Sequence, residues 1–246
     1  GTTTFTDLIR GEVSFENKLI DDQVILKSDG FPTYHLGVVV DDHEMQITHI
    51  IRGEEWISST PKHILLYQFF GWEIPNIAHV SVLRNPDKSK LSKRKNPVWV
   101  SWFRDQGYLP EAIRNYLATM AWSFPEGRDI FSLSEMIEVF DISQLQTTAP
   151  IFNIEKLRWM NGEYIRMKST EELKKLLGRN EPIMDKILPI VKERMKTLVE
   201  FDSLAGFFFE KPKEFERPKS EKLVQFIRSA LLSCDWNHDD MEKAIR

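Results

Sequence analysis

Residues 1–97 combine short apolar runs with turn-forming residues, a pattern that predicts strands. Gln23–Lys27 and Ile47–Ile51 are rich in β-branched residues, which favour strands. Ser28–Gly30 is typical of a turn, so Phe31–Tyr34 is expected to return as the partner of Gln23–Lys27. This part of the chain is therefore expected to contribute strands.

Helices are expected between these strands. The run Val38–Val40 suits a strand by propensity, yet its spacing to Leu36 and His43 also fits one helical face, and we predict a helix. A second helix is predicted to start at Ser59–Pro61, with serine as the cap and proline in the first turn, and to end at Gly71. Strands alternating with helices indicate an α/β layer.

The pattern becomes helical in the second part of the chain. Apolar residues recur at helical spacing over Pro110–Met120 and again, after a serine cap, over Ser132–Phe140. Asn153–Asn161 predicts a further short helix that ends just before Gly162. Residues 169–246 are charged, amphipathic and interrupted by four prolines, which predicts a separate helical bundle.

Composition narrows the class of protein. The 33 lysines and arginines against 37 acidic residues give a net charge of −4, which excludes a polybasic nucleic-acid-binding protein but allows a local basic patch that binds RNA. The single cysteine, Cys234, excludes an intrachain disulfide framework and favours a reducing compartment. No apolar run approaches the roughly 20 residues that a membrane-spanning helix needs. We therefore expect a cytoplasmic protein with no membrane partner.

The densest cluster of positive charge in the sequence is Arg84–Lys95, which contains six cationic residues and one aspartate. Turn formers at Asn85–Asp87 predict a loop. Ammonium groups combined with backbone amides and a hydroxyl suit a polyphosphate. A solvated charged loop or a simple RNA contact fits the composition equally well.

One segment of this loop, Lys90–Arg94 (Lys-Leu-Ser-Lys-Arg), resembles the Lys-Met-Ser-Lys-Ser signature of class I aminoacyl-tRNA synthetases, in the variant found in glutamyl-tRNA synthetases. Other segments resemble bacterial members of that family, in the family's order and over about residues 7–168: Phe31–Leu36, Val39–His43, Ile50–Trp56, Ser59–His63, Gly107–Ala112 and Lys156–Gly162.

The resemblance implies an α/β and all-α fold. It predicts the second half of a Rossmann-type catalytic domain over residues 1–97, a helical stem-contact domain over 98–168, and the start of a helical anticodon-binding domain over 169–246. It also implies that L-glutamate is activated by ATP to glutamyl-adenylate, with Mg²⁺ assisting, and is then transferred to the 3′ end of tRNA(Glu). A monomer is expected.

Site residues follow from the matching positions. The resemblance assigns catalysis to Lys93 and Lys90; ATP binding to Lys93, Lys90, Leu91, Ser92 and Leu83; glutamate binding to Tyr34, Arg52 and Val38; and tRNA binding to Lys156, Arg158 and Arg166. The guanidinium fork of Arg52 is well suited to hold a carboxylate. If Tyr34 and Val38 lie one helical turn apart, their side chains face the same way. From the residues alone, Arg52 could equally form a surface ion pair and Tyr34 could be a core aromatic.

No metal site is predicted. Residues 41–44 carry acidic side chains and a histidine, but adjacent residues point in different directions and helix capping is the more common role. His35, His49, His63 and His79 lie among apolar residues and are expected to be structural.

Two features depart from the family pattern. The family's His-x-Gly-His signature is not found, since His35–Val38 belongs to a later segment, so the 246 residues alone are expected not to catalyse ATP–pyrophosphate exchange. Val38 stands where many relatives have asparagine, which removes a side-chain hydrogen bond from the amino-acid pocket. A glutamyl-queuosine tRNA-modifying paralogue and a non-catalytic tRNA-binding fragment remain as alternatives.

Overall fold

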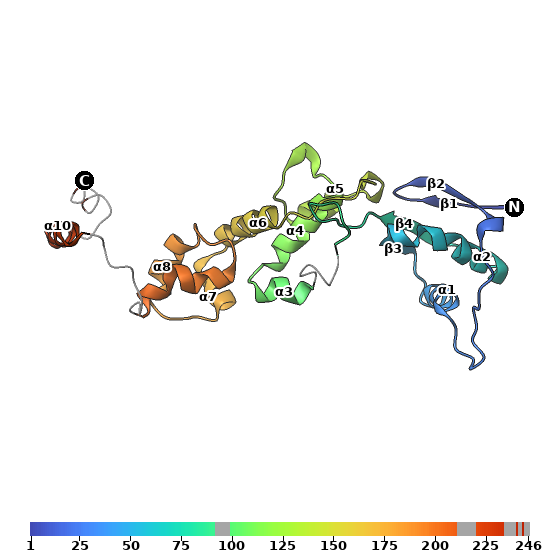
Figure 1. Cartoon of the computed structure of the whole chain (residues 1–246), viewed down its shortest axis with the longest axis horizontal. Coiled ribbons are helices and arrows are strands. Elements are labelled where there is room, and N and C mark those ends of the chain that lie inside the picture. The colour runs from blue at the N-terminus through green and yellow to red at the C-terminus, as the bar shows by residue number, and fades with distance from the viewer. Residues whose placement is uncertain (92–98, 211–219, 234–239, 241–242, 244–246) are drawn as a thin grey trace. The chain divides into compact units, whose positions relative to one another are not determined.

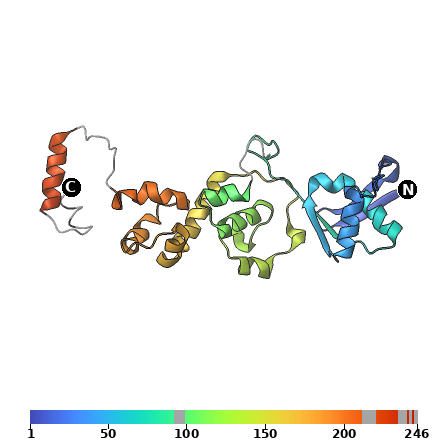
Figure 2. The same cartoon turned by 90° about the horizontal axis from the view of Figure 1, so that it is seen from below.

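The structure, a computed structural model, describes residues 1–91, 99–210, 220–233, 240 and 243. The chain divides into two compact units, Gly1–Leu204 and Ala205–Arg246. In Figures 1 and 2 the described strands all fall in the blue-to-teal part of the chain, and the green-to-red part that follows is helical. An α/β region followed by helices is therefore confirmed.

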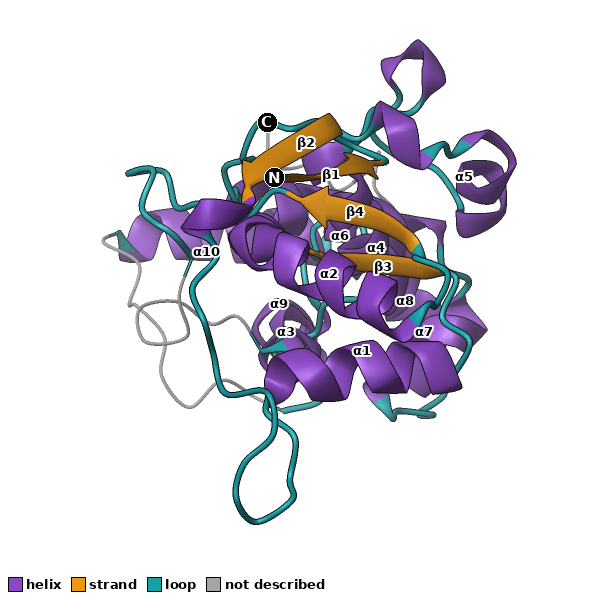
Figure 3. Cartoon of the chain, turned by 90° about the vertical axis from the view of Figure 1, so that its right-hand side faces the viewer, coloured by secondary structure: helices purple, strands orange, loops and turns teal. Residues whose placement is uncertain are grey.

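The sheet has four strands in the order β2-β1-β4-β3 (Figure 3). β1 (Thr2–Asp7) pairs antiparallel with β2 (Gly11–Glu16), whereas β4 (Asn76–Val80) runs parallel to both β1 and β3 (His49–Gly53). Alternate residues of β1 are buried, as expected for a strand with one face on the core. The mixed sheet brings the ends of β1, β3 and β4 together.

Two helices cover this sheet region. α1 (Tyr34–Glu44) contains the three valines, which confirms the predicted helix, and α2 (Thr60–Phe70) ends at Gly71 in the left-handed conformation, also as predicted. α2 packs on β1, and α1 packs on α2. The side chain of Ser59 makes no capping hydrogen bond, so that part of the prediction is wrong.

The predicted strands Gln23–Lys27 and Phe31–Tyr34 are not formed. The two segments do approach each other, but they make only an isolated bridge between Leu26 and Pro32, because Tyr34 already begins α1. β1 and β2, in contrast, were not individually predicted from the sequence.

The helices that follow are built on a second core. α4 (Pro110–Ala121), α5 (Leu133–Val139) and α6 (Ile154–Met167) follow the predicted periodicity, and Ser132 forms a full capping box with Glu135. α3 (Val100–Asp105) precedes them and was not individually predicted. The buried core of these helices includes Phe103, Tyr108, Tyr116, Leu157 and Met160.

The prediction that a helix ends just before Gly162 is wrong, because Gly162 lies inside α6. A Cβ at this position would lie 3.2 Å from the carbonyl oxygen of Met195. The glycine therefore permits close approach of two backbone segments, a role that local sequence does not distinguish from a helix end.

The remaining helices are α7 (Thr170–Leu177), α8 (Met184–Val191), α9 (Phe201–Ala205) and α10 (Glu221–Leu232). Short 3₁₀ turns also occur: η1 (Asn17–Leu19), η2 (Glu54–Ser59), η3 (Pro125–Gly127), η4 (Ile142–Gln144), η5 (Leu198–Glu200) and η6 (Gly206–Phe208). Among the described residues, no helix has the length and apolar character needed to cross a membrane.

Candidate functional site

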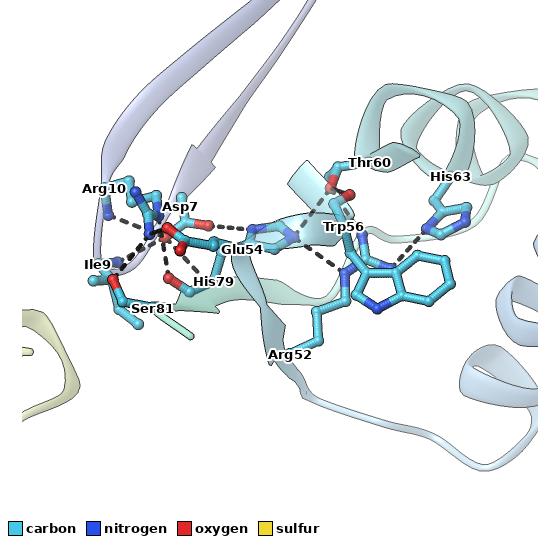
Figure 4. Close-up of polar contacts among 10 residues, drawn as sticks. All are labelled: Asp7, Ile9, Arg10, Arg52, Glu54, Trp56, Thr60, His63, His79 and Ser81. Carbon is cyan, nitrogen blue, oxygen red and sulfur yellow. Dashed lines mark hydrogen bonds and ion pairs between the residues drawn. The ribbon is translucent and has the colours of Figure 1, made fainter. Parts of the chain in front are cut away.

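Arg52 stands at the carboxyl end of β3, where three side chains fix its guanidinium group (Figure 4). Its Nε lies 3.1 Å from Nε2 of His79 and its Nη1 lies 3.1 Å from Nδ1 of His63. Its Nη2 donates to Oγ1 of Thr60 at 2.8 Å, and that hydroxyl donates to the carbonyl of Trp56. The arginine is therefore held by neighbouring elements and is not a free surface charge.

Aromatic rings lie beside this guanidinium group. The Trp56 ring lies 5.9 Å from Cζ of Arg52 and 4.9 Å from the ring of Tyr34, which is the first residue of α1 and is half exposed. The structure thus brings Tyr34 and Arg52 to one place. Trp56 belongs to this site, although no role was predicted for it from the sequence. Its place shortly after Arg52, which follows the predicted strand Ile47–Ile51, was the feature that could have indicated one.

Val38, the third residue assigned to glutamate binding, lies one helical turn after Tyr34. It packs against a buried cluster of Val39, Leu66 and Tyr67. Its side chain has no polar atom, so it can contribute only apolar contact to a neighbouring ligand.

The two histidines beside Arg52 are neutral at neutral pH. Burial lowers the pKa of His63 to about 3, with the positive charge of Arg52 as the next cause. Burial also lowers the pKa of His79, although the Asp7 carboxylate opposes that shift. For Arg52 itself burial lowers the pKa, while Tyr34, Asp42 and Asp7 raise it, and a guanidinium stays charged in proteins. The result is one positive fork between neutral acceptors, which suits a carboxylate ligand.

The described part of the basic loop is a tight hairpin that follows β4. The amide of Leu91 donates to the carbonyl of Leu83 at 3.1 Å, so these two residues assigned to ATP lie side by side. Lys90 ion-pairs with Glu55 at 3.2 Å. Ser92 and Lys93 lie outside the described residues.

Leu91 also borders an apolar cavity of about 590 Å³. The cavity is lined on its other sides by residues of α3 and of the segment that leads into α6, including Trp102, Phe103, Ile151 and Phe152. Of the residues assigned to ATP, Leu91 therefore lies beside the helices that follow the sheet region in the same compact unit.

The three residues assigned to tRNA all lie on α6, and each has an acidic partner in the protein. Lys156 pairs with Asp129 at 2.7 Å, Arg158 pairs with Glu200 at 2.6 Å, and Arg166 pairs with Glu163. Leu157 and Met160 of the same helix are buried. Among the described residues, no group of three or more histidine, cysteine, aspartate or glutamate side chains is arranged to hold a metal ion.

These features are those of the catalytic region of a class I aminoacyl-tRNA synthetase: a sheet with a basic residue at a strand end, a basic loop after β4, and a helical continuation. The chain belongs to the tRNA synthetases class I (E and Q), whose catalytic domain matches residues 1–159, and an anticodon binding domain matches residues 158–246.

The chain is similar to several curated glutamate–tRNA ligases. The one from Acidothermus cellulolyticus is 51% identical over 86% of this chain and 45% of its own length, and the one from Marinomonas sp. is 46% identical over 99% and 51%. A crystal structure of a glutamate tRNA ligase from Elizabethkingia meningosepticum, in complex with its amino acid, superposes with a TM-score of 0.84 at 34% identity, covering 99% of this chain and 56% of that one. The chain thus spans about half the length of the curated relatives it matches.

Proposed function

We propose that this chain supplies part of a glutamate–tRNA ligase, which activates L-glutamate with ATP and transfers it to the 3′ end of tRNA(Glu). The observation that carries the proposal is Arg52, a charged guanidinium fixed between neutral histidines at a strand end and flanked by Tyr34 and Trp56. Ligands of α/β sheets bind at the carboxyl ends of strands. The identity to glutamate–tRNA ligases supports glutamate as the carboxylate ligand.

In this proposal the protein acts by positioning and by electrostatic stabilisation. An oxygen of the glutamate α-carboxylate attacks the α-phosphorus of ATP, the bond to the β-phosphate oxygen breaks, and pyrophosphate leaves. Tyr34, Arg52 and Val38 hold the glutamate. Lys93 and Lys90 stabilise the charge that develops on the α-phosphate. Mg²⁺ would accompany ATP and offset the charge of its phosphates.

Nucleotide and RNA contacts complete the proposal. Leu83, Leu91 and Ser92 flank the nucleotide, and Lys156, Arg158 and Arg166 face the tRNA stem. We assign residues 1–97 to the catalytic domain, 98–168 to stem contact and 169–246 to the start of the anticodon-binding domain. We further propose a cytoplasmic enzyme that works as a monomer.

The two alternatives are less well supported. A glutamyl-queuosine tRNA-modifying paralogue would stop soon after the basic loop, whereas an anticodon binding domain matches residues 158–246 of this chain. A non-catalytic tRNA-binding fragment gives no reason for the fixed guanidinium group beside Tyr34.

The experiment is ATP–pyrophosphate exchange, measured with a full-length polypeptide that joins this chain to the part of the relatives it does not cover. We expect exchange that depends on glutamate, and an increase of at least tenfold in the KM for glutamate when Arg52→Gln removes the charged donor. Exchange supported equally by glutamine and glutamate, or an Arg52→Gln variant with an unchanged KM, would contradict the proposal.

A further inference from the structure

We propose that Asp7, His79, His63 and His35 are positioning residues that set the direction in which Arg52 presents its free N–H groups. This inference rests on the proposed role of Arg52 in binding a carboxylate. None of the four residues needs to touch that ligand. They act by holding the guanidinium from two sides.

The donor roles in this network follow from Arg52, because a guanidinium group has donors only. Nε2 of His79 must accept from Arg52, so the proton of His79 sits on Nδ1 and is donated to Oδ2 of Asp7 at 2.6 Å. Nδ1 of His63 must also accept from Arg52, so its proton sits on Nε2 and is donated to Nδ1 of His35 at 2.8 Å. The two histidines therefore carry opposite tautomers.

Asp7 anchors one side of the network. It is the last residue of β1 and is fully buried, and its Oδ1 accepts the amides of Ile9 at 2.9 Å and Arg10 at 3.0 Å. These hydrogen bonds and the one from His79 hold the pKa of Asp7 below its ordinary value against the effect of burial. An ionised carboxylate accepts only, so Asp7 fixes the tautomer of His79, which then offers a bare Nε2 to Arg52 (Figure 4).

Neutral histidines are required on both sides. A charged imidazolium would present an N–H to the N–H groups of Arg52, and the hydrogen bond from Arg52 to that ring would be lost. Burial and the charge of Arg52 lower the pKa values of His63 and His79, which keeps both rings neutral. Burial also lowers the pKa of His35, and the charges of Lys62 and Arg52 act in the same direction.

The arrangement leaves a defined part of Arg52 available. The hydrogen bonds to His79, His63 and Thr60 use one N–H on each of its three nitrogens. A guanidinium carries five N–H groups, so one N–H remains on each terminal nitrogen, and a carboxylate ligand and the nearby Tyr34 hydroxyl share these two.

Paired amide substitutions test the positioning role, because asparagine places its amide near Nδ1 of a histidine and glutamine places its amide near Nε2. At His79 the acceptor for Arg52 is Nε2, so His79→Gln keeps it and His79→Asn removes it. At His63 the acceptor is Nδ1, so His63→Asn keeps it and His63→Gln removes it. The tolerated amide is therefore opposite at the two positions.

The measurement is the KM for glutamate in exchange by the full-length polypeptide. We expect His79→Asn and His63→Gln to raise this KM by about tenfold or more, since each removes a hydrogen bond to a charged group, with a smaller change in kcat. His79→Gln and His63→Asn should stay within about threefold of the unsubstituted enzyme. His49→Asn is the matched control, because His49 is exposed at the start of β3 and should leave the KM unchanged. Equal effects of asparagine and glutamine at each position would overturn the proposal.

A second measurement needs neither substrate nor activity. Nitrogen-15 NMR of the 246-residue chain should show His79 protonated on Nδ1 and His63 protonated on Nε2, with the signals assigned from the single variants. The opposite tautomer at either residue would overturn the positioning role. If Arg52→Gln leaves the KM for glutamate unchanged while the tautomers are as expected, the proposed glutamate contact fails and the network itself stands.

Discussion

Lys90 ion-pairs with Glu55 at 3.2 Å, so the described lysine of the Lys-Leu-Ser-Lys-Arg loop contacts the segment that follows Arg52. Both side chains are exposed, at 61% and 44%, and such a pair contributes at most about 1 kcal/mol. A phosphate ligand can therefore displace Glu55 from Lys90 at little cost.

Glu55→Gln should release Lys90 and lower the apparent ATP constant by up to about fivefold, the range expected when a weak competing ion pair is lost. The measurement is the ATP dependence of exchange at low salt, where exposed charges are least screened. Glu44→Gln, at an exposed glutamate on α1, is the control. A higher ATP constant in the Glu55 variant would indicate that Glu55 helps to place Lys90 and does not compete with ATP.

Lys93 lies outside the described residues, but its proposed role makes a sharp prediction. Lys93→Ala should cut the rate constant of adenylate formation by roughly 10²–10³, as when one preorganised charge-stabilising donor is removed. The ATP constant should change much less, because the interaction forms in the transition state. Lys93→Arg should restore only part of the rate. A single-turnover rate within about threefold of the unsubstituted enzyme, with a strongly raised ATP constant, would make Lys93 a ground-state binder.

Local periodicity predicted those elements whose structure depends on neighbours in sequence. The helix through Val38–Val40, the helix over Pro110–Met120 and the cap at Ser132 are of this kind. Gly162 shows the limit, because its contact with Met195 comes from a segment 33 residues away and no local pattern encodes it.

The residues of the candidate site also fall into those that local motifs predicted and those that depend on distant segments. Tyr34 and Arg52 were found through local motifs, and the structure brings both to the ring of Trp56. The histidines were expected to be structural because each lies among apolar neighbours in sequence. The contact of His79 with Arg52 depends on the parallel pairing of β3 with β4, and the pairing of β4 with β1 places His79 against Asp7 from 72 residues away. His63 reaches Arg52 from α2.

The ion pairs on α6 sharpen the test of tRNA binding. Lys156→Ala combined with Arg158→Ala should weaken tRNA binding by the full-length enzyme and reduce its dependence on salt, because phosphate contacts release counterions. Glu200→Gln is the matched variant: it removes the acidic partner of Arg158 and leaves the arginine in place. We expect tRNA affinity in this variant to be equal or higher. A loss similar to that of the double variant would show that the ion pair, and not the RNA contact, is what matters.

Acid should destabilise the chain through His63. Its pKa is about 3 in the folded state and near 6.5 when unfolded, so the unfolded state binds a proton first as the pH falls. The stability linked to this histidine is complete above pH 6.5 and is lost progressively below it, by about 2 kcal/mol between pH 7 and pH 5. Urea unfolding at several pH values should show that the free energy of unfolding depends less steeply on pH in His63→Asn than in the unsubstituted chain. The same pH dependence in both would exclude His63 as the titrating group. His49→Asn serves as the control.

Gly107 provides the clearest test of packing between the helices. It has a φ of +76° in the turn between α3 and α4, and its carbonyl accepts the amide of Leu198 at 3.0 Å. A Cβ here would lie 2.6 Å from the nitrogen of Leu198, which is backbone and cannot move aside as a side chain can. Gly107→Ala should therefore lower the free energy of unfolding by more than about 2 kcal/mol, from the left-handed conformation and the overlap together.

Gly178→Ala is the matched control: its φ is +66° but no atom lies within 4 Å of the added Cβ, so only the conformational cost of about 1 kcal/mol applies. Equal losses in the two variants, measured by urea unfolding at neutral pH, would show that the turn at Gly107 relaxes away from Leu198 at no cost.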